Sequence, residues 1–332
     1  MARTMNMMNM TLVNNAAEAT VVTHNGVFHG DETMAIAMLS CCLKNVCIMR
    51  TGNPADAKEA AANGAIIVDV GGQYDPEKNF FDHHQWGFSE THEDGTKLSS
   101  AGLIWRKYGE EICSAFGCLA GREKEASKIV ERNLIHGIDA GDTGKHLPDG
   151  AWSIYNFLGS NNRTYRETNA PDPYAPNACV TDSELFLETC ELAYHILWRA
   201  VEKACSIVYG RKKVEKVIDD ATDAESQILE LPSFIEEWKE TVIKSDDGAD
   251  ILYGIYEDAL RHQWVVAAVP PALDQMNGQR KPLPETWRGK SAAELQEVSG
   301  VTDAIFCHIA GFMCTAKSRD GALRLAQLAV EA

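Results

Sequence analysis

The sequence lacks several features that would each assign it to a particular class of protein. No apolar run approaches the roughly 18 residues of a membrane-spanning helix. Its 10 cysteines form no CxxC pair and no zinc-finger spacing, and we interpret them as buried, reduced thiols of an intracellular protein. Basic residues are scarce: 31 Lys and Arg against 48 Asp and Glu give a net charge of −17, which disfavours long-range attraction to nucleic acid or anionic membrane.

What is present is typical of a globular protein of 332 residues, enough for two domains. The Met- and Asn-rich start predicts a disordered N-terminal extension over 1–17, with an organelle-targeting segment as the alternative. A stretch rich in Asn and Pro, 160–178, predicts a linker. We therefore expect a catalytic domain over 18–165 and a C-terminal substrate-binding domain over 180–332.

The first domain alternates short β-rich runs with helical patterns, which predicts an α/β fold with a parallel sheet covered by helices. The strands are expected at 19–23, 46–50 and 65–70, with helices at 32–43, 55–62, 99–108 and 122–138. The second domain is expected to be smaller and α+β, with helices at 183–208, 211–229 and 320–330 and strands at 251–257, 263–269 and 304–312. In parallel sheets, functional groups gather at the carboxyl ends of strands.

The densest group of polar residues with ligand chemistry is HNGVFHGDE at 24–32. His24, His29 and Asp31 lie between a predicted strand and a predicted helix. Imidazoles and carboxylates together suit Mn²⁺, Fe²⁺, Co²⁺ or Zn²⁺. Asp31 is also a natural helix N-cap, but that structural role leaves the two histidines unexplained.

Three later positions carry the same ligand types. Asp69 ends a buried strand, where a carboxylate must be paired or bind metal, and its two oxygens could bridge two ions. Neighbouring His83 and His84 follow Asp82, and adjacent residues of an extended segment point apart, so one can bind metal while the other faces substrate. Asp139 lies at a helix end, where capping is the plain structural alternative.

The order of these segments resembles the four motifs of the DHH phosphoesterase superfamily, which includes RecJ-type exonucleases and manganese pyrophosphatases. The residues within these segments resemble most those of one branch of the superfamily, the Myg-type exonucleases (the melanocyte-proliferating-gene family). The matching segments are HNGVFHGDE at 24–32, VDVGGQYD at 68–75, FDHHQ at 81–85, KLSSAGL at 97–103, Ile138-Asp139, WRG at 287–289, VSGV at 298–301, HIAGF at 308–312 and SRDGAL at 318–323. The resemblance covers about residues 19 to 330.

The resemblance implies a DHH phosphoesterase-like fold and a pair of divalent metal ions, most readily Mn²⁺, with Mg²⁺, Co²⁺ or Zn²⁺ as alternatives. It implies one metal held by His24, His29 and Asp69, and a second held by Asp31, Asp69, His83 and Asp139. His84 would contact the substrate phosphate, and Asp82 would support it. Asp142 is interpreted as structural.

Candidate substrate-binding residues lie outside the metal motifs. Ser99 and Ser100 precede a predicted helix, where they would hold a phosphate or cap the helix. Near the C-terminus the resemblance points to His308, Gly311 and Arg319. The family's further glycines are replaced over 313–315, which weakens the case for nucleotide binding there.

We therefore expect a metal-dependent phosphoesterase, in first place a 3′–5′ exonuclease acting on RNA or single-stranded nucleic acid. The acidic charge keeps open a phosphohydrolase acting on a small substrate, such as a short oligonucleotide, a nucleotide or pyrophosphate. A regulatory protein that keeps the fold without catalysis is a further alternative. The protein is expected inside the cell, with cytoplasm, nucleus and mitochondrion unresolved, away from membranes, and a homodimer is left open.

Overall fold

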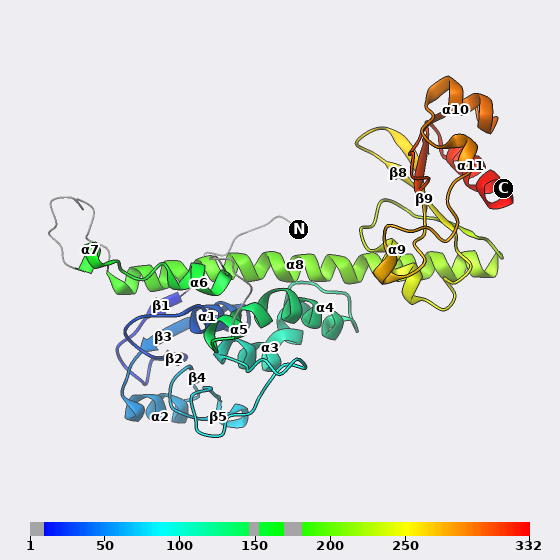
Figure 1. Cartoon of the computed structure of the whole chain (residues 1–332). Coiled ribbons are helices and arrows are strands. Elements are labelled where there is room, and N and C mark those ends of the chain that lie inside the picture. The colour runs from blue at the N-terminus through cyan, green and yellow to red at the C-terminus, as the bar shows by residue number, and fades with distance from the viewer. Residues whose placement is uncertain (1–9, 146–152, 169–180) are drawn as a thin grey trace. The chain divides into compact units, whose positions relative to one another are not determined.

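The computed structural model describes residues 10–145, 153–168 and 181–332. The chain divides into two compact units, Met1–Ser206 and Ile207–Ala332 (Figure 1). In the part that the structure describes, no helix has the length and apolarity needed to cross a membrane.

Unit 1 is built on a six-stranded sheet whose order is β1-β3-β2-β4-β6-β5. Only β5 runs antiparallel to its neighbour, and the other paired strands are parallel, as the sequence predicted. The strands are β1 Met10–Leu12, β2 Val21–Thr23, β3 Val46–Arg50, β4 Ile66–Val68, β5 Tyr74–Asp75 and β6 Phe80–Phe81.

The pairing of β1 with β3 corrects the predicted disordered extension. Met10 pairs with Val46 and Leu12 with Ile48, so residues 10–12 of the predicted extension form an edge strand of the sheet. The first nine residues of that prediction lie outside the described residues.

Helices cover both faces of this sheet. Val22, Ile67 and Phe80 form a buried cluster with Ala57 and Ala60 of α2 on one face. On the other face the ring of Phe81 contacts Tyr108 of α3, with ring centroids 6.1 Å apart. Among the described residues, the helices that lie wholly within unit 1 are α1 Gly30–Cys42, α2 Pro54–Ala62, α3 Ser100–Ala115, α4 Glu123–Val130, α5 His136–Asp142, α6 Ile154–Gly159 and α7 Tyr165–Thr168, with a 3-10 turn Pro76–Lys78 and a π-helical turn Glu131–Ile135.

Strand order brings the candidate motifs together. β2, β4 and β6 are neighbours in the sheet and run parallel. His24 directly follows β2, Asp69 follows β4 and Asp82 follows β6. The three motifs therefore meet at one edge, the carboxyl ends of parallel strands.

Helix α8, Asp182–Asp223, corrects the prediction of two separate helices. The helix continues through Gly210, because one glycine in a helix interior costs only about 1 kcal/mol. The division between the units falls within α8, C-terminal to the predicted linker 160–178. The start of α8 belongs to unit 1 because its side chains pack there: the Phe186 ring lies 5.6 Å from Phe28.

Unit 2 contains a five-stranded sheet of order β10-β11-β9-β8-β7. Its pairs are antiparallel except β7 with β8. The strands are β7 Ile228–Glu230, β8 Tyr253–Asp258, β9 Gln263–Ala268, β10 Ala304–Cys307 and β11 Met313–Ala316. The helices are α9 Trp238–Lys244, α10 Ala292–Ser299 and α11 Arg319–Glu331, with 3-10 turns Leu273–Gln275 and Glu285–Trp287.

The predicted strand 304–312 is wrong as a single element. β10 ends at Cys307, and the chain turns through 308–312 into β11. Gly311, with a φ of 69°, adopts the left-handed conformation in this turn. Residues 313–315 accordingly serve as a strand paired with β9.

Candidate metal centre

The candidate site is centred on Asp69, whose backbone adopts the left-handed conformation at a φ of 57°. Asp is among the few residues besides Gly that tolerate this region. The side chain is buried, and its two oxygens face different histidines. Oδ2 lies 3.3 Å from His24 Nε2, and Oδ1 lies 3.2 Å from His83 Nε2.

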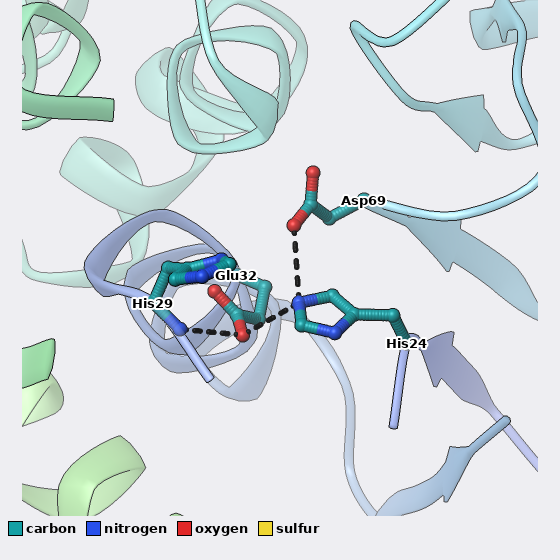
Figure 2. Close-up of side chains that lie close together, drawn as sticks. All are labelled: His24, His29, Glu32 and Asp69. Carbon is teal, nitrogen blue, oxygen red and sulfur yellow. Dashed lines mark hydrogen bonds and ion pairs between the residues drawn. The ribbon is translucent and has the colours of Figure 1, made fainter. Parts of the chain in front are cut away.

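One group of ligand atoms surrounds Asp69 Oδ2. Figure 2 shows His24, His29 and Glu32 converging with Asp69. His24 Nε2 lies 2.9 Å from Glu32 Oε1, which also accepts a hydrogen bond from the His29 backbone N–H at 2.8 Å. Sequence reasoning did not select Glu32 as a site residue, although it lies inside the 24–32 motif.

A second group surrounds Asp69 Oδ1. His83 Nε2 lies 3.2 Å from Asp69 Oδ1, 3.3 Å from Asp142 Oδ2 and 3.9 Å from Asp31 Oδ2. Ligand atoms of His29, Asp31 and Asp142 also lie within 4.8 Å of one another. The two groups therefore share Asp69 and adjoin through His29.

The groups leave buried polar atoms without protein partners. Among the described residues, both carboxylate oxygens of Asp31 and Oε2 of Glu32 are buried and have no hydrogen-bond partner. Such atoms cost free energy unless something else satisfies them. Because they converge with other carboxylates and imidazoles, their chemistry fits divalent cations.

The electrostatics show how much negative charge is gathered here. Burial and the nearby charges of Asp69 and Asp142 raise the pKa of Asp31 well above its usual range. Burial also opposes the charged form of His24, but its hydrogen bonds to Asp69 and Glu32 prevail and raise its pKa to about 10. Burial disfavours ionised Asp69 too, yet hydrogen bonds from His24 and His83 lower its pKa. The cluster thus draws in positive charge.

The structure does not bring Asp139 to these groups. Its buried Oδ1 accepts from the Ser99 N–H at 3.1 Å, the Ser99 hydroxyl at 2.6 Å and the Gly102 N–H at 3.0 Å. Its Oδ2 lies 2.7 Å from His92 Nε2. The predicted metal ligand is therefore engaged at the start of α3, and Asp142, which was interpreted as structural, lies in the cluster instead.

His84 of the FDHHQ motif and Ser100 of the KLSSAGL motif both lie next to Asp69. Asp82 Oδ1 is 2.8 Å from His84 Nδ1, and Asp82 Oδ2 accepts from the Gly72 N–H at 2.6 Å. The Ser100 hydroxyl donates to Asp69 Oδ1 at 3.0 Å. Ser100 therefore positions the Asp69 carboxylate. The His84 side chain, by contrast, is 63% exposed and can be reached from solvent.

The predicted C-terminal substrate residues have local partners in unit 2. Arg319 pairs with Glu230 through two bonds, Nε to Oε1 at 2.6 Å and Nη2 to Oε2 at 2.5 Å. The ring of His308 lies 4.4 Å from Phe312, beside the turn at Gly311. A pocket of about 780 Å³ in this unit is lined by other residues, among them Phe234 and Tyr256.

Two residues that sequence reasoning missed support the motifs from α6 and the turn after it. The Tyr155 hydroxyl donates to Asp142 Oδ1 at 3.3 Å, and its ring packs closely against Gly30 and Gly141. Asn162 holds the 24–32 loop through both backbone groups of Phe28, at 3.0 and 2.6 Å. Neither residue belongs to a recognisable motif, so only the structure shows these roles.

Comparison with known proteins gives a consistent family assignment. A family model labelled MYG1 exonuclease and described as an uncharacterised protein family (UPF0160) matches residues 20–330. The MYG1 exonuclease of Homo sapiens is 31% identical over 334 residues, covering 92% of this chain and 84% of the human protein. The MYG1 protein of Dictyostelium discoideum is 31% identical over 332 residues, covering 93% and 96%.

A solved structure of the pGpG-specific phosphodiesterase PggH from Vibrio is 13% identical, with a TM-score of 0.32, and the match covers 95% of this chain and 98% of that one. This likeness is too low to carry an argument. The predicted enzyme class, a hydrolase of the nuclease or phosphodiesterase kind, is confirmed by the exonuclease relatives of Homo sapiens and Rattus norvegicus. With a family model spanning its two units and relatives at about 30% identity over nearly its whole length, the chain belongs to the MYG1 exonuclease family.

Proposed function

We propose that this protein is a two-metal phosphodiesterase. His24, His29 and Asp69 would hold one divalent ion, and Asp31, Asp69, His83 and Asp142 the other, so that Asp142 takes the place first given to Asp139. One observation carries the proposal: the two oxygens of the buried Asp69 face separate groups of ligand atoms, at 3.3 Å and 3.2 Å from two different imidazoles. A carboxylate in that position can bridge two ions.

When bound, such ions supply an activated water and neutralise the charge that builds up on phosphate oxygens. The protein's own residues do the positioning. Asp82 holds Nδ1 of His84, which leaves Nε2 of the exposed imidazole to donate to a phosphate oxygen. The hydrogen bond to Asp82 raises the pKa of His84, which favours this donating form.

The substrate we propose is RNA or another single strand, degraded from the 3′ end, with Mn²⁺ as the preferred ion. The human and rat relatives named exonuclease support a nucleic-acid substrate. Membership of the DHH superfamily, which the motifs at 24–32, 68–75 and 81–85 indicate, supports hydrolysis by a metal pair.

A phosphohydrolase acting on a small substrate is the second candidate, favoured by the net charge of −17. Nucleic-acid backbones normally require several cationic contacts. Near the sheet of unit 1, Lys78 is paired with Asp75 at 2.7 Å and Lys107 lies 3.5 Å from Glu77. Pyrophosphate or a nucleotide would need fewer such contacts.

The test compares the wild type with Asp69→Ala on end-labelled RNA, end-labelled single-stranded DNA and pyrophosphate, each with Mn²⁺. We expect a ladder that shortens from the 3′ end and a loss of roughly 10³-fold or more in Asp69→Ala. Asp75→Ala, which removes a half-buried carboxylate that pairs with Lys78 outside the cluster, is the matched control and should keep full activity.

Three outcomes would count against parts of this proposal. Undiminished activity in Asp69→Ala would refute the two-metal site. Release of phosphate from pyrophosphate alone would replace the exonuclease with the small-substrate enzyme. A wild type that binds two ions but hydrolyses none of the three substrates would favour the regulatory alternative.

A further inference from the structure

An exposed tryptophan lies in the turn that follows His83 and His84 of the candidate metal centre. The side chain of Trp86 is 102% exposed, as open as in a free peptide. It follows His84 by two residues. An indole is normally at least partly buried, because its large apolar surface is poorly hydrated, so full exposure next to a reactive site calls for a reason.

The backbone around Trp86 is held in place. The Phe88 N–H donates to the carbonyl of Gln85 at 3.3 Å, which closes a four-residue turn. Gly87, the third residue of that turn, has a φ of 78°, as a type II turn requires. Trp86 therefore occupies the outer corner of a defined turn.

Both ends of the turn are anchored to the site itself. With its amide oriented to satisfy its neighbours, Gln85 donates to the Asp82 carbonyl at 2.8 Å and accepts from the Tyr74 N–H at 3.2 Å. The Phe88 ring lies 6.4 Å from the ring of Tyr74 and 6.2 Å from that of His83. The turn is thus fixed on a metal-ligand candidate, and the indole is presented to solvent on a rigid support.

A flat, rigid and hydrated aromatic surface suits an unpaired nucleobase. Stacking on a base is tolerant of sequence and does not depend on cationic side chains. It therefore supplies affinity without a cation, and one cation of this unit is already engaged: Arg106 pairs with Glu90 and donates to the carbonyl of Thr91. Pyrophosphate has no surface that could use the indole.

We propose that Trp86 stacks on the unpaired base of the nucleotide whose phosphodiester lies at the Asp69 centre. This inference rests on the proposed nuclease function and names the chemical feature by which the site selects its substrate. Trp86 would then favour binding of single-stranded nucleic-acid ends over small phosphates, which have no base, and over paired ends, whose terminal base is already stacked.

The experiment combines substitutions of Trp86 with removal of the bases from the substrate. Wild type, Trp86→Ala and Trp86→Phe are assayed on a short oligoribonucleotide and on the same strand with abasic residues at the reactive end. We expect Trp86→Ala to lower kcat/KM on the ordinary strand about tenfold, within the range for loss of one stacked base, and Trp86→Phe to lower it less. On the abasic strand the three proteins should be equal. Leu260→Ala, which removes an exposed side chain from the turn between β8 and β9, is the control and should match the wild type.

Equilibrium binding separates this inference from the proposed function. In the Asp69→Ala background, fluorescence anisotropy of the labelled strand should show about tenfold weaker binding when Trp86 is also replaced by Ala. Equal loss on both strands would show that Trp86 merely shapes the turn, and no loss on either would show that it does not touch substrate; both overturn the proposal. If the wild type hydrolyses no oligonucleotide, the nuclease function fails, and the anisotropy result alone decides whether Trp86 binds a base.

Discussion

At the scale of single residues, the position of the Asp69 carboxylate depends on an unusual backbone conformation. A non-glycine residue at a φ of 57° is uncommon, and Gly71 and Gly72 follow with φ values of 102° and 66°. The chain therefore turns sharply as it leaves β4, and the side chain lies between His24 and His83. Backbone strain of this kind is retained where the surroundings fix it, which fits a functional role.

Asp142 and Asp139 can be distinguished by metal content. Asp142→Asn should reduce the bound divalent metal from two ions per chain to about one, because its Oδ2 lies 3.3 Å from His83 Nε2. Asp139→Asn should keep both ions but lower the free energy of unfolding by about 1–3 kcal/mol, since it leaves buried donors poorly matched. Titration calorimetry and chemical denaturation measure the two effects. The reverse pattern would restore Asp139 as the ligand.

The sequence could not decide between these two aspartates. They are three residues apart on one helix, so both lie on the same helix face and either can reach a common neighbour. Only the packing of α5 against α3 separates them, since it places Asp139 at the backbone N–H groups of Ser99 and Gly102. By contrast, the convergence of His24, Asp69 and His83 could be predicted, because each directly follows or adjoins the end of a parallel strand.

Metal affinity should rise with pH because the metal-free site holds protons. With the pKa of His24 raised to about 10, its imidazole is protonated at neutral pH and must lose a proton before Nε2 can bind metal. The raised pKa of Asp31 acts in the same direction. Between about pH 6 and about pH 9 each displaced proton should improve the dissociation constant by up to tenfold per pH unit.

The same raised pKa affects the metal-free fold. Stability from the charged His24 is fully present below its unfolded pKa of about 6.5 and is lost as the pH rises through about 10.

Calorimetry of Mn²⁺ binding in buffers of different ionisation enthalpy counts the protons that the site releases when it binds metal. If metal uptake released none, these protonation states would be wrong.

At the scale of elements, the contact between α5 and the start of α3 supports the site. Asp139 of α5 accepts from the first turn of α3, and Ser100 in that turn donates to Asp69. A π-helical turn, Glu131–Ile135, precedes α5, and Glu131 Oε1 lies 3.1 Å from His92 Nδ1. Such π turns often occur near functional sites, where they adjust the direction of the following helix.

Two glycines test this contact. A Cβ at Gly102 would lie 2.2 Å from Asp139 Oδ2, so Gly102→Ala should separate α3 from α5 and lower the free energy of unfolding by about 1–3 kcal/mol. It should also lower activity by displacing Ser100. Gly137 of α5 has nothing within 4 Å of such a Cβ, so Gly137→Ala should be neutral or stabilise by up to about 1 kcal/mol. Equal effects in thermal denaturation would contradict the role of the contact.

Strands that are continuous apolar runs were predictable, and very short or interrupted elements were not. The apolar runs at 46–50 and 65–70 gave β3 and β4, since buried parallel strands are continuously apolar. β5 and β6 have only two residues each, too few to show a period, and β7 begins within the stretch 211–229 that was predicted as helix. The hairpin of β10 and β11 was missed because the turn at Gly311 lies within an apolar stretch.

At the scale of the whole molecule, each unit has its own buried core. In unit 2, Tyr253 and Val266 of the sheet pack with Leu325 of α11. In unit 1, Val22 and Ile67 pack with Ala60 of α2. The ligand candidates all belong to unit 1, so bound metal should act on the stability of that unit first.

Hydrogen exchange measures this localisation in the intact protein. Mn²⁺ at about 100 times its dissociation constant should stabilise the folded site by about 2.7 kcal/mol, because the unfolded chain does not assemble the ligands. Exchange should therefore slow by up to roughly 100-fold in peptides that contain β4 and the start of α1, and remain unchanged in β8 and β9. Asp69→Ala should abolish the protection, whereas Asp75→Ala should keep it. Equal protection in β8 and β9 would show that metal binding is not confined to the Asp69 centre, since the described ligand groups all lie before Ser206.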